Sequence, residues 1–391
     1  MQEKIKRLAQ EAASDLVQMR RHLHRHPELS TQEVETGRYI QTKLSEWGIA
    51  CTTGWSGTGV VGVIEGKNPS SRCVALRADM DALPIEEQTG LEFASQNKGV
   101  MHACGHDVHM ASLLGAAKIL QSLKDEWQGT VKLIFQPSEE DFRAGAPKMI
   151  EQGVLENPAP ERIYALHVMP ELECGRVGVK TGQYMASTDE IYIKARGKAG
   201  HGAMPEQCVD TVLMSAYILT SLQQVVSRNA PPYIPTVLSF GRIVGDGRTN
   251  IIPAEVNMEG TLRTFNEEWR AKAHDCIVRC AQGIAQSMGG SCEVYIDHGY
   301  PFVNNDAEAA DLVRKVAGDM LGKEQVDELP PRMTAEDFAY YTQRIPGCMF
   351  RLGVKPPGLK EPSNLHTATL TIDENALCIG AEILAGLGAS A

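Results

Sequence analysis

A ten-residue segment, MHACGHDVHM (101–110), concentrates side chains that bind transition metals. It contains His102, Cys104, His106, Asp107 and His109. Residues two apart in an extended loop point the same way, so Cys104 and His106 can share one metal ion. A polar loop before a helix is the alternative, but a Cys-x-His pair flanked by two more histidines favours a metal site.

A pair of adjacent acidic residues, Glu139 and Glu140, stands in QPSEED (136–141). The preceding TVKLIFQ (130–136) predicts a buried strand, and the carboxyl end of such a strand is where an α/β sheet presents its ligands. One carboxylate could bind metal while the other transfers protons. Taken alone, however, the pair fits a solvated acidic turn better.

Two isolated histidines complete the set of candidate metal ligands. His167 in ALHVMP (165–170) lies within a predicted buried strand, and His366 in NLHTAT (364–369) follows a Pro-rich loop. Each is weak evidence by itself, because a lone histidine in a strand is more often a hydrogen-bonded core residue. Together with the cysteine and the glutamates they form the donor set of a catalytic transition-metal site at the ends of separate elements.

Two aspartates, Asp79 and Asp81, occur in RADMDALP (77–84) at the end of another predicted strand. An aspartate at that position can hold a metal-binding histidine in the required tautomer. A turn-capping role is an equal alternative for Asp79 and a weaker one for Asp81.

Three polar residues in the middle of the chain are candidates for substrate binding. His201 lies between glycines in GKAGHGAMPE (197–206), a poor setting for core packing. Asn250 lies in GRTNIIPAE (247–255), and Arg263 lies on a predicted strand. Together they could bind a carboxylate and a developing oxyanion, although Arg263 could equally be a surface residue.

Hydrophobic periodicity predicts the elements that must position these residues. An amphipathic helix runs from Ile5 to about Leu23 and must end by Pro27, and a second covers about 31–47. Strands alternate with helices after that, which indicates an α/β domain with a central mixed sheet. The predicted strands are 60–66, 73–80, 130–136 and 164–168, and a helix covers about 107–124.

The middle of the chain follows a different order, β-α-β-β-α-β, which predicts an inserted ferredoxin-like α+β domain. Its strands are 190–197, 236–245, 255–265 and 292–300, with helices at about 208–227 and 266–288. The α/β pattern then resumes, with helices at about 306–321, 334–343 and 373–388 and a strand at 348–354. We therefore expect a catalytic domain formed by 1–185 and 300–391, and an insertion at 186–299.

Composition excludes several classes of protein. The 391 residues carry a net charge of −11 without a strongly basic stretch, which argues against nucleic acid and anionic membrane as partners. No apolar run reaches the roughly 20 residues that span a bilayer. The N-terminus lacks the apolar core of a signal peptide, so we expect a cytoplasmic protein. The ten cysteines form no CxxC pair and indicate no disulfide framework.

The ordered motifs resemble those of the aminoacylase/carboxypeptidase-type co-catalytic metallopeptidases. Within that family the chain looks most like the amidohydrolase branch, which contains hippurate hydrolases, N-acyl-amino-acid hydrolases and auxin-conjugate hydrolases. The match extends essentially end to end, through RRHLHRHPELS, RADMDALP, MHACGHDVH, QPSEE, ALHV, GKAGHGAMP, GRTNIIP, AEDFAYY and NLHTA.

The resemblance implies two divalent metal ions per subunit, with zinc, manganese, nickel or cobalt as candidates. Their implied ligands are Cys104, His106, Glu140, His167 and His366, with Cys104 in place of the bridging aspartate of the wider family. Glu139 is then the general base, and Asp81 also serves catalysis. The insertion becomes a lid that mediates homodimerisation, from which His201 reaches the partner's active site, while Asn250 and Arg263 serve the substrate carboxylate.

The expected function is cleavage of the amide bond in N-acyl-L-amino acids of the hippurate or N-acetyl type. A water activated by the metals would lose its proton to Glu139 and attack the amide carbonyl. A carboxypeptidase or dipeptidase is the nearest alternative. A Cys104 nucleophile paired with His106 or His109 would leave the other donors unexplained, and a non-catalytic metal-binding protein would have no use for Glu139.

Overall fold

The computed structural model describes residues 1–141 and 145–390, and the chain divides into two compact units. The first consists of Met1–Tyr184, Asn304–Pro330 and Asp337–Ala391, and the second of Met185–Val303 and Pro331–Glu336. The second unit thus contains the predicted insertion 186–299 but also takes in Pro331–Glu336, which the sequence had assigned to the catalytic part. The reason is pairing between residues far apart in sequence, since the N–H of Ala186 donates to the carbonyls of Arg332 and Thr334, both at 3.1 Å.

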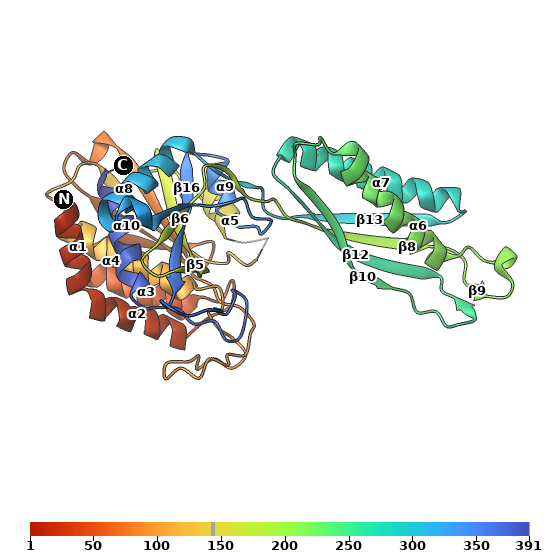
Figure 1. Cartoon of the computed structure of the whole chain (residues 1–391), viewed down its shortest axis with the longest axis horizontal. Helices are drawn as coiled ribbons and strands as arrows, with labels where there is room; N and C mark the ends of the chain where they lie inside the picture. Colours follow the sequence, from red (N-terminus) through yellow and green to blue (C-terminus); the bar gives the residue numbers. More distant parts are fainter. Residues whose placement is uncertain (142–144, 391) are drawn as a thin grey trace. The chain divides into compact units, whose positions relative to one another are not determined.

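A mixed eight-stranded sheet forms the centre of the first unit, as the sequence predicted (Figure 1). Its strand order is β1-β2-β4-β3-β5-β16-β6-β15, and β4, β3, β5 and β16 run parallel to one another. The strands are β1 (Ala50–Trp55), β2 (Gly59–Glu65), β3 (Cys73–Asp79), β4 (Thr130–Gln136), β5 (Arg162–Glu173), β6 (Val177–Val179), β15 (Val326–Glu328) and β16 (Gly347–Lys355).

Helices pack against this sheet and enclose one hydrophobic core. Two of them, α4 (His106–Ser122) and α10 (Ala376–Ser390), contact each other and are buried along most of their length. The others are α1 (Gln2–Glu11), α2 (Ala13–Arg25), α3 (Val34–Glu46), α5 (Ala146–Glu151), α8 (Ala307–Leu321) and α9 (Ala339–Thr342). Because α4 begins at His106, the helix holds one end of the Cys/His segment in place.

Two expectations for this unit were wrong in detail, and one strand was missed. The N-terminal helix is broken at Ala12, which ends α1 and precedes α2. The helix expected at 334–343 shrinks to α9, because the residues before it pair within the second unit and the Asp337 carboxylate is held by Arg77. Strand β1 was not predicted, because this edge strand is mostly exposed and lacks an apolar pattern.

The second unit has the predicted ferredoxin-like order. Its sheet follows the order β10-β12-β8-β13 with all neighbours antiparallel, and α6 and α7 supply the helices (Figure 1). The elements are β8 (Asp189–Arg196), α6 (Thr211–Gln224), β10 (Thr236–Val244), β12 (Glu255–Thr264), α7 (Glu267–Ser287) and β13 (Ser291–His298). A two-stranded ribbon, β9 (Gly200–His201) with β11 (Ile251–Ile252), extends from it. Side-chain caps begin both helices, from Asp210 and Asn266.

The remaining elements are short: β7 (Gly182–Met185), β14 (Val303–Asn305), the 3-10 turns Pro69–Ser71, Pro205–Gln207 and Lys323–Gln325, and a π-helical turn at Val225–Asn229. All ten cysteines are unpaired. Among the described residues, none of the helices combines the length and apolarity that a membrane crossing requires.

A buried acid in α10 makes the stability of the first unit depend on pH. Glu382 is only 7% exposed, and burial raises its pKa to about 7 against a small opposing effect of Lys6. The folded chain therefore keeps a proton that the unfolded chain releases near pH 4.5. The contribution of Glu382 to stability is therefore fully present below that pH and is lost as the pH rises through about 7.

We expect Glu382→Gln to raise the melting temperature at pH 8 and to leave it nearly unchanged at pH 4.5, because the amide never ionises. The gain at pH 8 should be about 1–2 kcal/mol, a conservative share of the 1.36 kcal/mol per pKa unit. Thermal unfolding at both pH values measures it, with exposed Glu324→Gln as the control. Equal effects of the Glu382 substitution at both pH values would contradict this account.

Candidate metal centre

The carboxyl ends of three neighbouring strands bring the candidate residues together. Strand β3 ends at Asp79, which lies opposite Gln136 at the end of β4, and β5 carries His167. The loop after β4 holds Glu139 and Glu140. Because parallel strands end at one edge of the sheet, segments far apart in sequence converge there.

Cys104 belongs to two groups of potential metal ligands. The donor atoms of Cys104, His106 and His167 all lie within 4.8 Å of one another, and so do those of Cys104, Glu140 and His366. Within the first group, the Cys104 sulfur is 3.5 Å from His167 Nε2. In the second, His366 Nε2 is 3.2 Å from Glu140 Oε1. The thiol thus lies where two triads meet.

Backbone carbonyls fix the orientation of two of the imidazoles. His106 Nδ1 donates to the carbonyl of Asp81 and His167 Nδ1 to that of Val168, both at 2.8 Å. Each ring therefore turns its Nε2 toward the cluster, as metal-binding histidines do, and Asp79 and Cys104 raise the pKa of His106 against the effect of burial. His106 Nε2 is buried without a hydrogen-bond partner among the described residues. Such an atom costs about 1–3 kcal/mol unless something binds it, so the donor set fits a cation.

Protons occupy part of this site when no cation is bound. Burial, reinforced by Glu140, raises the pKa of Cys104, and burial lowers the pKa of His167. Hydrogen bonds to Cys104 and Glu140 raise the pKa of His366 to about 10, although this side chain is half exposed. A metal ion must therefore displace protons from Cys104, His366 and His106, since the pKa of His106 is raised as well.

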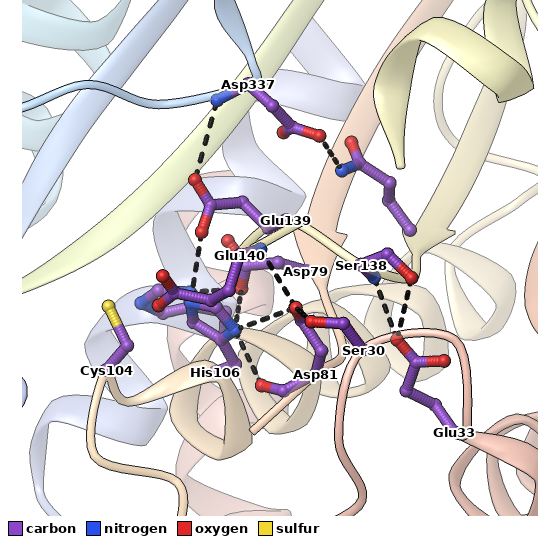
Figure 2. A network of polar contacts seen from close by, with 12 residues as sticks. Ser30, Glu33, Asp79, Asp81, Cys104, His106, Ser138, Glu139, Glu140 and Asp337 are labelled. Atoms are coloured by element: carbon purple, nitrogen blue, oxygen red, sulfur yellow. Dashed lines mark hydrogen bonds and ion pairs between the residues drawn. The ribbon is translucent and has the colours of Figure 1, made fainter. Parts of the chain in front are cut away.

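Glu139 lies beside the cluster rather than in either triad. The residue is only 5% exposed. Its Oε2 atom is 4.0 Å from His106 Nε2, and its Oε1 atom accepts a hydrogen bond from the Asp337 N–H at 3.5 Å (Figure 2). The Asp337 carboxylate in turn accepts hydrogen bonds from Gln136 Nε2 at 2.6 Å and from the Ala146 N–H at 2.9 Å. It thereby ties together the residues that flank the loop of the two glutamates.

Asp79 and Asp81 orient other groups. Asp81 Oδ2 accepts hydrogen bonds from the Glu140 N–H at 2.9 Å and from Ser30 Oγ at 2.7 Å (Figure 2). Asp79 Oδ1 accepts the Nδ1 proton of His109 at 2.6 Å, and His109 Nε2 accepts the Val168 N–H at 3.0 Å. With both nitrogens used, His109 holds the backbone next to His167 and has no lone pair left for a metal.

The two other polar residues of the Cys/His segment also lie outside the triads. Asp107 accepts hydrogen bonds from Arg20 Nε at 2.7 Å and from His24 at 2.9 Å, which ties α4 to α2. His102 is buried, burial lowers its pKa to about 4, and its ring nitrogens have no hydrogen-bond partner among the described residues.

The three predicted substrate-binding residues all lie in the second unit, in two different places. His201 and Asn250 are neighbours on the β9–β11 ribbon, where the Gly202 N–H donates to the Asn250 carbonyl at 2.8 Å, and both side chains are exposed. Arg263 lies on β12, eight residues beyond Glu255, which is roughly 26 Å along the strand.

Residues that sequence reasoning missed surround the glutamate loop: Ser30, Glu33, Ser138 and Asp337. Asp337 falls in the AEDFAYY motif, but nothing in that motif indicates that its carboxylate accepts bonds from residues 191 and 201 positions away. Glu33 and Ser138 carry no spacing signal at all.

Comparison with known proteins gives the chain its family. The model of the peptidase family M20/M25/M40 matches residues 75–389. The chain belongs to this family. It is therefore a hydrolase of amide bonds, and its donor cluster fits the divalent metal ions on which such metallopeptidases depend.

Similar proteins cover between 78% and 97% of this M20-family chain. N-acyl-L-amino acid amidohydrolase of Geobacillus stearothermophilus is 43% identical over 78% of this chain and 82% of its own. Thermostable carboxypeptidase 1 of Saccharolobus solfataricus is 38% identical over 97% and 96%. The crystal structure of YxeP from Bacillus subtilis, described as a dinuclear metal-binding peptidase of the M20 family, superposes with a TM-score of 0.82 at 36% identity, covering 97% and 98%.

We expect the affinity for a divalent metal to rise with pH and metal binding to release protons. His366, with its pKa of about 10, and the buried thiol are protonated in the metal-free site at neutral pH. Each displaced proton should weaken binding by about tenfold per unit of falling pH. Competition with a chromophoric chelator at pH 6, 7 and 8 measures the affinity, and calorimetry in two buffers counts the protons.

His366→Ala should reduce both the change of affinity with pH and the proton count, whereas His298→Ala in the second unit should change neither. An affinity independent of pH would contradict the protonation of these groups.

Proposed function

We propose that the chain hydrolyses the amide bond of N-acyl-L-amino acids of the hippurate or N-acetyl type, with two divalent metal ions and Glu139 as the general base. The observation that carries this proposal is the pair of donor triads that share Cys104, with the Glu139 carboxylate beside them. The amidohydrolase named above supports the substrate class.

The proposed ligands are Cys104, His106, Glu140, His167 and His366. Metal ions held by them would polarise the amide carbonyl and lower the pKa of a water from about 15.7 toward about 7. Thiolate and imidazole suit zinc, nickel or cobalt, and the more open side with Glu140 and half-exposed His366 could also take manganese. Asp81 then acts as a positioning residue, because it holds both His106 and the backbone of Glu140.

Glu139 is the group placed to move protons. Its carboxylate is almost fully buried and close to His106 Nε2, which the proposal assigns to a metal. It can take a proton from the attacking water and give it to the leaving amine. A Cys104 nucleophile is disfavoured, because burial and the nearby Glu140 raise the pKa of the thiol and because that role would leave Glu140 and His366 without a function.

Arg263 is suited to bind the substrate carboxylate. It lines a groove of about 400 Å³ with Tyr192, Arg242 and Thr261, and burial lowers its pKa. Its guanidinium donates to Thr261 Oγ1 at 3.2 Å and forms no ion pair with a described residue. A half-buried guanidinium can bind a carboxylate in a bidentate manner, in competition with Glu190 and Glu259, which also line the groove. We assign stabilisation of the oxyanion to His201 and further substrate contacts to Asn250.

A substrate panel, with Glu139→Gln as its matched variant, tests the function. N-acetyl, N-benzoyl and indoleacetyl amino acids should be hydrolysed faster than dipeptides. Glu139→Gln should lower kcat by about 10²–10⁴-fold while retaining the metal, because only the proton acceptor is lost.

Metal analysis of the purified variants provides the control, since Glu140→Gln should lose metal as well as activity. A Glu139→Gln enzyme that keeps near wild-type rates would refute the assignment of the base. Preference for dipeptides or longer peptides would favour the carboxypeptidase or dipeptidase alternative, which the Saccharolobus relative represents.

We further propose that the second unit forms a homodimer. Arg263 is eight residues along β12 from Glu255, and Asn250 precedes that end of the strand beside the β9–β11 ribbon, so we propose that a site using both residues needs two copies of the chain. An unpartnered apolar face is available on α6, where Val212, Leu213 and Tyr217 are 48–54% exposed. Strand β10 is also a free sheet edge.

We expect a Leu213→Glu, Tyr217→Glu double variant to be monomeric, because two charges on this face cannot be buried without partners. Light scattering after gel filtration measures the mass. Lys272→Glu with Arg279→Glu on the charged face of α7 is the matched control and should keep the wild-type mass. A double variant with an unchanged dimer, or a monomeric wild type, would show that this face does not mediate association.

A further inference from the structure

Buried carboxylates satisfy the backbone of the loop that carries Glu139 and Glu140. Glu33 accepts the Ser138 N–H at 2.8 Å, and Asp81 accepts the Glu140 N–H at 2.9 Å (Figure 2). Because this loop is irregular and buried, its N–H groups have no partners in a strand or helix, and the carboxylates accept their hydrogen bonds instead. Of these two carboxylates, Glu33 makes no contact with a proposed metal ligand.

Ser138, the residue directly before Glu139, has a strained backbone. It is fully buried and has φ of +57°, in the left-handed region that costs a residue with a side chain about 1–2 kcal/mol. This conformation turns the chain sharply just after β4. The direction in which Glu139 leaves the backbone therefore depends on whether Ser138 keeps it.

Contacts from the segment before α3 hold Ser138 in this conformation. Glu33 Oε1 accepts from both the N–H and the hydroxyl of Ser138, the latter at 3.2 Å. The Thr31 N–H donates to Ser138 Oγ at 2.8 Å. Glu33 is itself fully buried, and its other oxygen accepts the Thr58 hydroxyl at 2.8 Å. Three hydrogen bonds thus orient the Glu33 carboxylate, and two of them hold one residue of the loop.

We infer that Glu33 is a positioning residue for the general base: its carboxylate keeps Ser138 in the left-handed conformation that directs Glu139 toward the metal cluster. This inference rests on the proposed role of Glu139. It assigns no chemistry to Glu33, which acts only through the loop backbone.

Two substitutions of Glu33 test whether its hydrogen bonds to Ser138 are needed for activity. Glu33→Gln retains an oxygen for Ser138 and offers its amide to the Thr58 hydroxyl, so kcat should stay within about threefold of wild type. Glu33→Ala leaves the loop N–H unsatisfied, so kcat should fall by about 10–100-fold, since a displacement near 1 Å can cost 10²-fold. KM and the metal content should change little in either variant.

A second-site substitution provides a rescue that a general loss of stability would not produce. Glycine adopts positive φ without strain. Ser138→Gly should therefore raise kcat in the Glu33→Ala background by about threefold or more, while it lowers kcat slightly in wild type. Failure of this rescue, or a folded, metal-loaded Glu33→Ala enzyme with wild-type kcat, would overturn the inference.

Glu28 supplies the matched control. It lies five residues from Glu33 and accepts the N–H groups of Glu35 at 3.2 Å and Thr36 at 2.8 Å in the first turn of α3, without touching the loop. Glu28→Ala should lower the melting temperature and leave kcat of the folded enzyme unchanged. If Glu28→Ala and Glu33→Ala lower kcat equally, the effect is one of stability and the inference fails.

Hydrogen exchange of the peptide 137–141 separates this inference from the proposed function. Glu33→Ala should accelerate exchange at Ser138 and Glu139, whereas Glu33→Gln and Glu28→Ala should not. A wild-type enzyme that cleaves no N-acyl amino acid would contradict the proposed function, and the exchange data would still decide whether Glu33 holds the loop. Unchanged exchange in Glu33→Ala would overturn the inference by itself.

Discussion

A group of metal-binding atoms held in a buried position is the constraint on which the rest of this structure depends. Carbonyls of Asp81 and Val168 accept hydrogen bonds from Nδ1 of His106 and His167, so that the Nε2 atoms of both rings face the Cys104 sulfur. Burial disfavours the thiolate form of Cys104 and the protonated form of His167. A cation resolves all of these costs at once, because it binds the lone pairs and neutralises the thiolate. The parallel strand ends and the start of α4 at His106 serve to keep these atoms in place.

The need to hold these atoms in place also explains the buried carboxylates around the loop that carries Glu139 and Glu140. The loop after β4 must bring Glu139 and Glu140 to the cluster, and no regular element can make that turn. Its backbone N–H groups are instead accepted by Glu33 and Asp81, and the Asp337 carboxylate connects Gln136 to Ala146. Arg77 balances the buried charge by donating to both Asp79 and Asp337 at 2.6 Å. The loop is thus defined by ionic hydrogen bonds rather than by packing, which makes its geometry sensitive to single substitutions.

Periodicity in the sequence predicted the mixed sheet and the ferredoxin-like order, because amphipathic alternation is a local property of each strand and helix. The same approach failed where distant pairing decides the outcome. Nothing local separates Pro331–Glu336 from the helix expected there, since its partner is the backbone of Ala186. Donor residues could be named because Cys, His and paired Glu are chemically distinctive. The partners of the loop could not, because Glu33 and Asp337 are ordinary acids whose contacts lie 105 and 201 residues away.

The division of the chain also bears on how selectivity arises. All five proposed metal ligands and the proposed base belong to the first unit, and the residues assigned to substrate recognition belong to the second. Amide hydrolysis at the donor cluster needs no particular acyl group. On the proposed assignment, discrimination comes from Arg263 and its groove on β12, and from His201 and Asn250 at the β9–β11 ribbon. Relatives with similar sequences are named amidohydrolase and carboxypeptidase. This is understandable if the chemistry is fixed by one unit while substitutions on the sheet and ribbon of the other alter the substrate.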